Sequence, residues 1–151
     1  MTTLHNILSA RDSKTFATAS GTKMHIRLRH IVLEDDTQCG DSDLISKIQQ
    51  RSDLVPFFCR TSKTEVPIAG TIKGRFISRR IDRLLVNHDE KTVKILDYKT
   101  DINPNERKSI YVSQINEYIQ LMRAIYPGYK ISGYILWTHD FLLEKIPSKP
   151  L

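Results

Sequence analysis

The sequence predicts an α/β or α+β fold, a sheet with helices packed on it, and two patterns carry this prediction. Apolar residues recur at helical spacing near both ends of the chain, whereas residues 65–99 alternate between apolar and polar side chains as strands do. The expected order is therefore helix, helix, several strands, helix, strand. The 151 residues are enough for one domain with a single core.

Two helices are expected before the strands. The first would be capped by Ser20, and its apolar face consists of residues at helical spacing: Met24, Leu28, Ile31 and Val32. Residues 40–42, Gly-Asp-Ser, then signal a turn. A short second helix follows and ends near Ser52; its apolar residues are Leu44, Ile45 and Ile48.

The rest of the chain is expected to form strands around one long helix. A meander of short strands covers residues 66–69, 75–77, 81–86 and 93–98, with a turn at residues 88–91. The long helix runs from Ser109 to Ile125, and Pro127-Gly128 stops it. A buried strand over residues 131–137 and a short edge strand over residues 142–146 complete the prediction.

The charge balance favours an anionic partner, nucleic acid first. The net charge is +6 and the isoelectric point is about 9.4. The cations form two groups in the sequence, which are Lys73, Arg75, Arg79, Arg80 and Arg83, and then Lys23, Arg27 and Arg29. Such groups can also be no more than a solvated face, so charge alone does not decide between these interpretations.

The sequence also predicts in which cellular compartment the protein is found. No apolar run approaches the roughly 20 residues that span a bilayer, so no membrane association is expected. Residues 1–10 lack the pattern of a secretory signal, and we expect a cytoplasmic protein. The two cysteines, Cys39 and Cys59, have no zinc-site or Cys-x-x-Cys spacing and are expected to be free thiols in a reducing compartment.

The sharpest chemical signal is the sequence Asp97-Tyr98-Lys99. In a strand, Asp97 and Lys99 point to one face while Tyr98 points to the other. A carboxylate can hold a divalent cation, and a neighbouring lysine can activate water and stabilise developing negative charge during phosphodiester cleavage. The alternative is a simple ion pair at a strand end.

A second carboxylate, Asp82, lies within an apolar strand just before the hairpin that leads to Asp97. If the two strands pair through the turn at residues 88–91, the carboxylates approach each other and repel unless a cation lies between them. Mg²⁺ would accept two carboxylates and a backbone carbonyl while keeping several waters. Alternatively, Asp82 forms an ion pair with Arg80 or Arg83.

Two helical features are weaker candidates. His25 could be a metal ligand on the first helix, or a partly buried or surface histidine. His30 competes with it, but a spacing of five residues places the two about 140° apart around a helix, so both cannot easily bind one metal. Gln114 and Tyr118 share one face of the long helix, where they could reach a nucleic-acid backbone or form a polar rim.

Taken in order, these motifs resemble the RecB-like branch of the PD-(D/E)xK nucleases. The motifs are Gly-Thr-x-x-His at 21–25, Glu-Val-Pro at 65–67, Ile-Asp-Arg-Leu at 81–84, Asp-Tyr-Lys-Thr at 97–100 and Gln-x-x-x-Tyr at 114–118. More narrowly, the sequence is similar to the C-terminal nuclease domain of AddA, the subunit that processes double-strand breaks, of the alphaproteobacterial type. Residues 134–138 resemble the last strand of that domain.

The resemblance implies a restriction-endonuclease-like core, with a mixed central sheet flanked by helices, over residues 18–151 after an irregular leader over residues 1–17. It also implies a metal-dependent deoxyribonuclease, with Mg²⁺ or Mn²⁺ as cofactor and single-stranded DNA or duplex ends as partner. The residues to which it assigns roles are His25, Asp82, Asp97 and the Tyr98 carbonyl as metal ligands, Lys99 as the catalytic lysine, Gln114 and Tyr118 as support for the site and the DNA, and Glu65 as an acid near the site.

Two departures from the family accompany this prediction. Relatives usually carry glycine where this chain has Arg79, which, like Arg80, could contact phosphate or could crowd the site. The helicase motor of AddA is also missing from this sequence. The alternative hypothesis is therefore a non-catalytic module that binds DNA and docks onto a separate helicase subunit, whereas an intact Asp-x-Lys pair favours an exonuclease.

Overall fold

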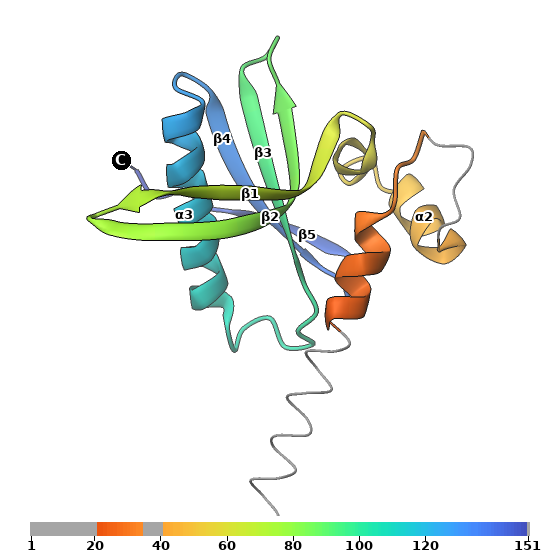
Figure 1. Cartoon of the computed structure of the whole chain (residues 1–151). Coiled ribbons are helices and arrows are strands. Elements are labelled where there is room, and N and C mark those ends of the chain that lie inside the picture. The colour runs from red at the N-terminus through yellow and green to blue at the C-terminus, as the bar shows by residue number, and fades with distance from the viewer. Residues whose placement is uncertain (1–20, 35–40, 151) are drawn as a thin grey trace, which may run out of the picture.

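The computed structural model describes residues 21–34 and 41–150, which form a five-stranded mixed sheet with helices on both faces (Figure 1). The spatial order of the strands follows the chain: β1 (Ser62–Ile72), β2 (Arg75–Asn87), β3 (Thr92–Lys99), β4 (Lys130–Trp137) and β5 (Leu142–Ile146). Only β3 and β4 are parallel, and α3 (Lys108–Ile125) makes the crossover between them. The predicted α/β class, with a mixed sheet between helices, is confirmed.

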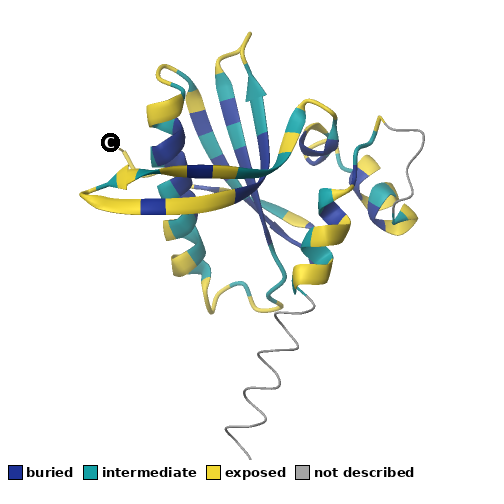
Figure 2. Ribbon diagram, in the orientation of Figure 1, coloured by how far each residue is buried: buried dark blue, intermediate teal, exposed yellow. Residues whose placement is uncertain are grey.

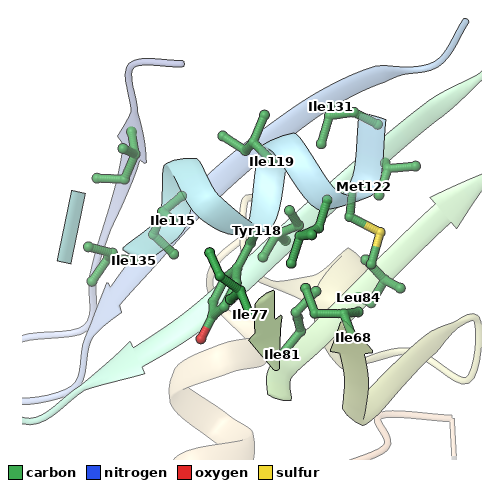
Figure 3. Close-up of a cluster of buried hydrophobic side chains, with 14 of the residues drawn as sticks. Ile68, Ile77, Ile81, Leu84, Ile115, Tyr118, Ile119, Met122, Ile131 and Ile135 are labelled. Carbon is green, nitrogen blue, oxygen red and sulfur yellow. The ribbon is translucent and has the colours of Figure 1, made fainter. Parts of the chain in front are cut away.

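Two hydrophobic clusters fill the two sides of the sheet, and consecutive residues in the second halves of β3 and β4 are therefore buried (Figure 2). On one side α3 packs Ile115, Ile119 and Met122 against strand residues that include Ile77 and Ile135 (Figure 3). The other side is covered by the helix over residues 21–29, by α2 (Ser42–Gln49) and by the 3₁₀ helix η1 (Val55–Phe58).

Most of the predicted elements are present with small shifts at their ends. The long helix begins one residue before the predicted Ser109, and the edge strand over residues 142–146 has the predicted bounds. Asp41, placed in a turn from the sequence, is the N-cap of α2 and accepts from the backbone N of Leu44 at 3.3 Å. The 3₁₀ helix was not predicted. None of the helices described is long and apolar enough to cross a membrane.

The first helix is shorter than predicted. It covers residues 21–29, and Ile31 and Val32 follow it as irregular chain instead of continuing its apolar face. Ile31 is nevertheless buried, because the segment after the helix lies on the sheet. The predicted cap Ser20, the leader over residues 1–17, Gly40 and Cys39 lie outside the described residues. Cys59 is a free thiol.

β2 is one strand of 13 residues, so the prediction of two strands at 75–77 and 81–86 was wrong. Residues 78–80 between them are polar and exposed, but their backbones stay paired with β1. Beyond Asp82 the β1–β2 hairpin forms a projection over residues 66–80, here called the arm. Ile68 and Ile77 on its inner face are buried in the same cluster as α3.

The arm and the rest of the sheet separate at one point of β2. β2 pairs with β3 from Asn87↔Thr92 as far as Arg83↔Leu96, whereas it pairs with β1 to the tip of the arm. Beyond Arg83 the arm passes across α3 while β3 continues in its own direction (Figure 1). The pairing of β2 with β3 therefore ends next to Asp82 and Asp97, and this point where the two strands diverge is here called the corner.

Candidate active site at the corner between β2 and β3

Asp82 and Asp97 lie on the two strands that border the corner. Continuing the β2–β3 register by one residue from Arg83↔Leu96 places Asp82 opposite Asp97, as the hairpin prediction expected. Only 9% of Asp82 and 4% of Asp97 is exposed. The Asp82 carboxylate accepts from the backbone N of Tyr98 at 2.7 Å, so it takes the place of the backbone partner that β3 loses where β2 turns away.

Lys99 lies beside Asp97, with its Nζ 2.6 Å from Asp97 Oδ2. The two side chains share a face of β3, as the strand period predicts. Lys99 also donates to Gln114 Oε1 at 3.0 Å and lies 4.4 Å from the centre of the Tyr111 ring. Side chains on α3 therefore hold the ammonium group at the corner instead of leaving it in solvent.

Gln114 and Tyr118 meet on one face of α3, as their spacing of four predicts. The Gln114 amide donates to the Tyr118 hydroxyl at 2.7 Å, and that hydroxyl lies 3.5 Å from the Arg80 carbonyl of β2. Burial raises the pKa of Tyr118, with the charge of Asp97 acting in the same direction, so its hydroxyl stays protonated at neutral pH. These bonds connect Lys99, through α3, to the start of the arm.

His25 reaches the corner from the other face of the sheet. Its Nδ1 lies 2.8 Å from the Gly21 carbonyl, which can only accept, so Nδ1 carries a proton. Its Nε2 lies 3.3 Å from Asp82 Oδ2. The hydrogen bond with Asp82 raises the pKa of His25 more than burial lowers it. His30 contacts exposed Arg29, so the structure brings His25 but not His30 to the site.

Asp97 carries the most perturbed carboxyl group of the site. Burial raises its pKa to about 6; the charge of Lys99 opposes this shift and the charge of Asp82 adds to it. Among the described residues its Oδ2 is the one buried side-chain oxygen without a hydrogen-bond partner. The 2.6 Å contact with Lys99 is therefore an ion pair without good hydrogen-bond alignment, because distance alone does not make a hydrogen bond.

The chemistry of these donors suits a hard divalent cation. Asp97 Oδ2 has a free acceptor site, and Nε2 of His25 faces a carboxylate while its Nδ1 is fixed by a carbonyl, the arrangement typical of a metal-binding imidazole. The N–H of Tyr98 points to Asp82, so its carbonyl points to the same edge of β3. However, no three His, Cys, Asp or Glu side chains in the described part of the chain converge into a complete ligand cluster.

Glu65 lies on β1 opposite Asp82, between the paired residues Thr64↔Arg83 and Val66↔Ile81. Its backbone has a positive φ of 52°, which costs free energy for a residue with a side chain and interrupts the pairing at this position. Its carboxylate lies 3.4 Å from Arg80, and Arg79 lies 3.3 Å from Glu117. Asp82 has neither of the arginine partners considered from the sequence, because Arg80 faces Glu65 and Arg83 points into the interior.

The sequence analysis placed Arg83 wrongly. It grouped Arg83 with cations expected on the surface, but the residue is only 1% exposed. Its guanidinium stacks 4.3 Å from the Phe58 ring and donates to six atoms: the carbonyls of Leu28, Arg29, Ile31 and Phe57 and the hydroxyls of Ser62 and Tyr98. It thereby ties the end of the helix that carries His25 to β2, beside Asp82. The one feature of the sequence that could have indicated its burial is its position within an apolar strand.

Comparison with known proteins supports the fold. No family model and no curated protein sequence matches this chain significantly. Among solved structures it is similar to a protein from Eubacterium rectale named "Putative exonuclease", with a TM-score of 0.53 and 15% identity over 93% of this chain. A second similar structure is that of SSO0001, with a TM-score of 0.47 and 16% identity over 92% of this chain. This chain spans 58% and 55% of those two chains.

Proposed function

We propose that this protein is a metal-dependent deoxyribonuclease of the RecB-like type, cutting phosphodiester bonds at the corner between β2 and β3. One observation carries the proposal: Asp82, Asp97 and Lys99 converge where the pairing of β2 with β3 ends, with Lys99 2.6 Å from one carboxylate and His25 3.3 Å from the other. The ion pair of Lys99 with Asp97, and that of His25 with Asp82, could each be purely structural. Two adjacent buried carboxylates with an unsatisfied oxygen, however, do not stabilise a fold.

In this proposal Asp82, Asp97, His25 and the Tyr98 carbonyl would hold Mg²⁺ or Mn²⁺. Such an ion, when bound, would lower the pKa of a water and neutralise charge at the scissile phosphate. Lys99 would orient the attacking water and stabilise the negative charge that develops on the phosphate. Gln114 holds Lys99, and Tyr118 holds Gln114. Arg79 and Arg80 contact phosphates of the bound strand, and Glu65 keeps Arg80 at the corner.

The biological role that fits is exonucleolytic processing of DNA ends in double-strand-break repair. The narrower resemblance to the AddA nuclease domain supports this role, and so does the structural similarity to the Eubacterium rectale protein named "Putative exonuclease". A separate helicase subunit is the partner that would feed strand to the site. This chain spans only 58% of that neighbour's length. We therefore propose the helicase partner and the role in double-strand-break repair, and do not take them from the neighbour.

The test is cleavage of end-labelled single- and double-stranded DNA by the purified chain with Mg²⁺, with Mn²⁺ and with EDTA. We expect metal-dependent cleavage, reduced by about 100-fold or more in Asp97→Ala and in Lys99→Ala. Asp140→Ala and Lys145→Ala are matched controls that remove the same charges away from the corner. A closed circular substrate distinguishes exonuclease from endonuclease, because only an endonuclease can cut DNA that has no end.

Two results would contradict the proposal. Equal cleavage by the folded Asp97→Ala variant would move the chemistry away from the corner. A folded wild-type chain that binds DNA but cleaves nothing with either metal would instead support a binding module that docks onto a helicase.

A further inference from the structure

The arm is a two-stranded ribbon with a defined shape. Its strands pair without a break from Val66↔Ile81 to Ile72↔Arg75. The turn at Lys73 and Gly74 has positive φ at both residues, 49° and 76°, the combination that closes a two-residue hairpin in the twist of its strands. Gly70 lies so close to α3 that an added Cβ would be 2.6 Å from Leu121, so the middle of the arm is packed on the helix while its tip projects beyond it (Figure 1).

Charge on the arm has one sign. Residues 66–80 contain Lys73, Arg75, Arg79 and Arg80 and no aspartate or glutamate. Arg75 and Arg79 share a single carboxylate, that of Glu117 on α3, at 2.9 and 3.3 Å. The Arg75 and Arg80 side chains are 70% and 68% exposed, so their donors remain available to an anion.

The outer face of the arm carries an aromatic side chain that the core does not use. Phe76 is 71% exposed near the tip. The pairs Thr71↔Phe76, Ala69↔Ser78 and Pro67↔Arg80 lie on this face, since directly opposite residues in an antiparallel pair share a face. All six residues are exposed, and four of them are small. The result is a slim basic ribbon with one apolar side chain near its end.

We propose that the arm binds double-stranded DNA by entering one of its grooves, on the duplex that leads to the bond cut at the corner. This inference rests on the proposed nuclease function. The major groove is about 12 Å wide and admits a two-stranded ribbon, with cations on the phosphates and an apolar side chain against the base edges. A surface for single strands would instead be a concave channel with several aromatic side chains. The arm is instead a two-stranded ribbon with one exposed aromatic side chain, Phe76.

The strand geometry places this contact at a fixed distance from the cut. β2 continues unbroken from Phe76 to Asp82, which is about 20 Å at roughly 3.3 Å per residue. That length corresponds to about six base pairs at roughly 3.4 Å each. The substrate inferred is therefore a duplex with a frayed or single-stranded end, in which the end reaches the corner and the duplex lies along the arm.

The test measures binding without cleavage, by fluorescence anisotropy in EDTA with Lys99→Ala as the parent protein. The probes are a labelled single strand and the same strand annealed to a complement that leaves a short single-stranded end. The arm variant combines Lys73→Asn with Phe76→Ser, because asparagine tolerates the positive φ of the turn. The matched control combines Lys91→Asn, at the other positive-φ lysine turn, with Leu142→Ser, at another exposed apolar residue.

We expect the arm variant to bind the tailed duplex about tenfold more weakly than its parent, with the single strand bound equally well and the control variant unchanged. The slope of log K against log salt for the tailed duplex should fall by about 0.9, the value for one lost phosphate contact. If the arm variant bound the tailed duplex as tightly as its parent, or lost affinity equally for both probes, the inference about the arm would be overturned. The proposed nuclease function would still stand. Absence of DNA binding by the folded wild-type chain would overturn the proposed function together with it.

Discussion

At the scale of single residues, burial sets the properties of Asp97. A carboxylate that is 4% exposed and has an unsatisfied oxygen is costly to ionise, and the nearby Lys99 compensates this cost only in part. In the proposed function, a bound cation would recover the free energy that the fold loses by holding Asp97 ionised. Stability and the proposed activity therefore oppose each other at this residue.

The pKa of Asp97 gives a prediction about stability and pH. Its folded-state pKa of about 6 is raised above the ordinary value of 3.8, so its stabilising contribution is complete below about pH 4 and is lost as pH rises through 6. Asp97→Asn removes this titration. In EDTA the variant should gain roughly 1–3 kcal/mol relative to wild type between pH 4 and pH 8, measured by urea unfolding. A constant difference between the two proteins across this range would refute the assignment.

Arg83 gives a second prediction at the same scale. Arg83→Met keeps the volume roughly but leaves the carbonyls of Leu28, Ile31 and Phe57 without their buried donor. We expect a loss of about 2–4 kcal/mol in the free energy of unfolding, as for several buried acceptors left unsatisfied. The control Arg75→Met, at a side chain that is 70% exposed, should change it by about 0.5 kcal/mol or less. Equal effects of both substitutions would show that the buried donor network is not stabilising.

At the scale of elements, the position of α3 on the sheet depends on a close approach to β4. Gly133 faces the helix, and an added Cβ would lie 2.2 Å from Ile115 Cγ2 and 3.2 Å from Ile119 Cδ1. Ile115 is fully buried and its Cγ2 methyl is close to the backbone, so rotation of the side chain cannot relieve the contact. The helix itself would have to move, and it carries Gln114 next to Ile115.

Gly133→Ala should therefore destabilise the protein by about 1–3 kcal/mol, the usual cost of overpacking a core. Thermal unfolding followed by circular dichroism measures this loss, with Ser132→Ala in the same strand as the control. A shift of α3 also withdraws Gln114 from Lys99, so DNA cleavage should fall in the same variant at temperatures where it is folded. An unchanged midpoint would mean that the helix and strand have room to separate.

The elements themselves were largely predictable because their patterns are local. α3 was found from its apolar spacing and its Pro127-Gly128 stop, and β5 from its length and edge character. β2 was divided wrongly because residues 78–80 are polar on both faces, and only their pairing with β1 shows that the strand continues. The first helix was extended too far because Ile31 is apolar, although it is buried after the helix has ended.

At the scale of the whole molecule, the candidate site exists because the sheet divides. β1 and β2 leave the sheet together as the arm, so the pairing of β2 with β3 ends just before Asp82 and Asp97. Asp82 contacts His25, and Lys99 beside Asp97 contacts Gln114 of α3. In a flat sheet of the same strands the β2–β3 ladder would continue through these two residues.

The sequence by itself determined the fold class, the Asp97-x-Lys99 face and the Gln114–Tyr118 pair, because strand and helix periods depend on neighbours along the chain. Only the tertiary structure decided that Arg83 is an internal donor, that Arg80 faces Glu65 instead of Asp82, and that His25 rather than His30 reaches the corner. These outcomes depend on which carbonyls and carboxylates distant segments bring together. Spacing along the chain carries no information about such partners, because the bend of β2 and the packing of α3 select them.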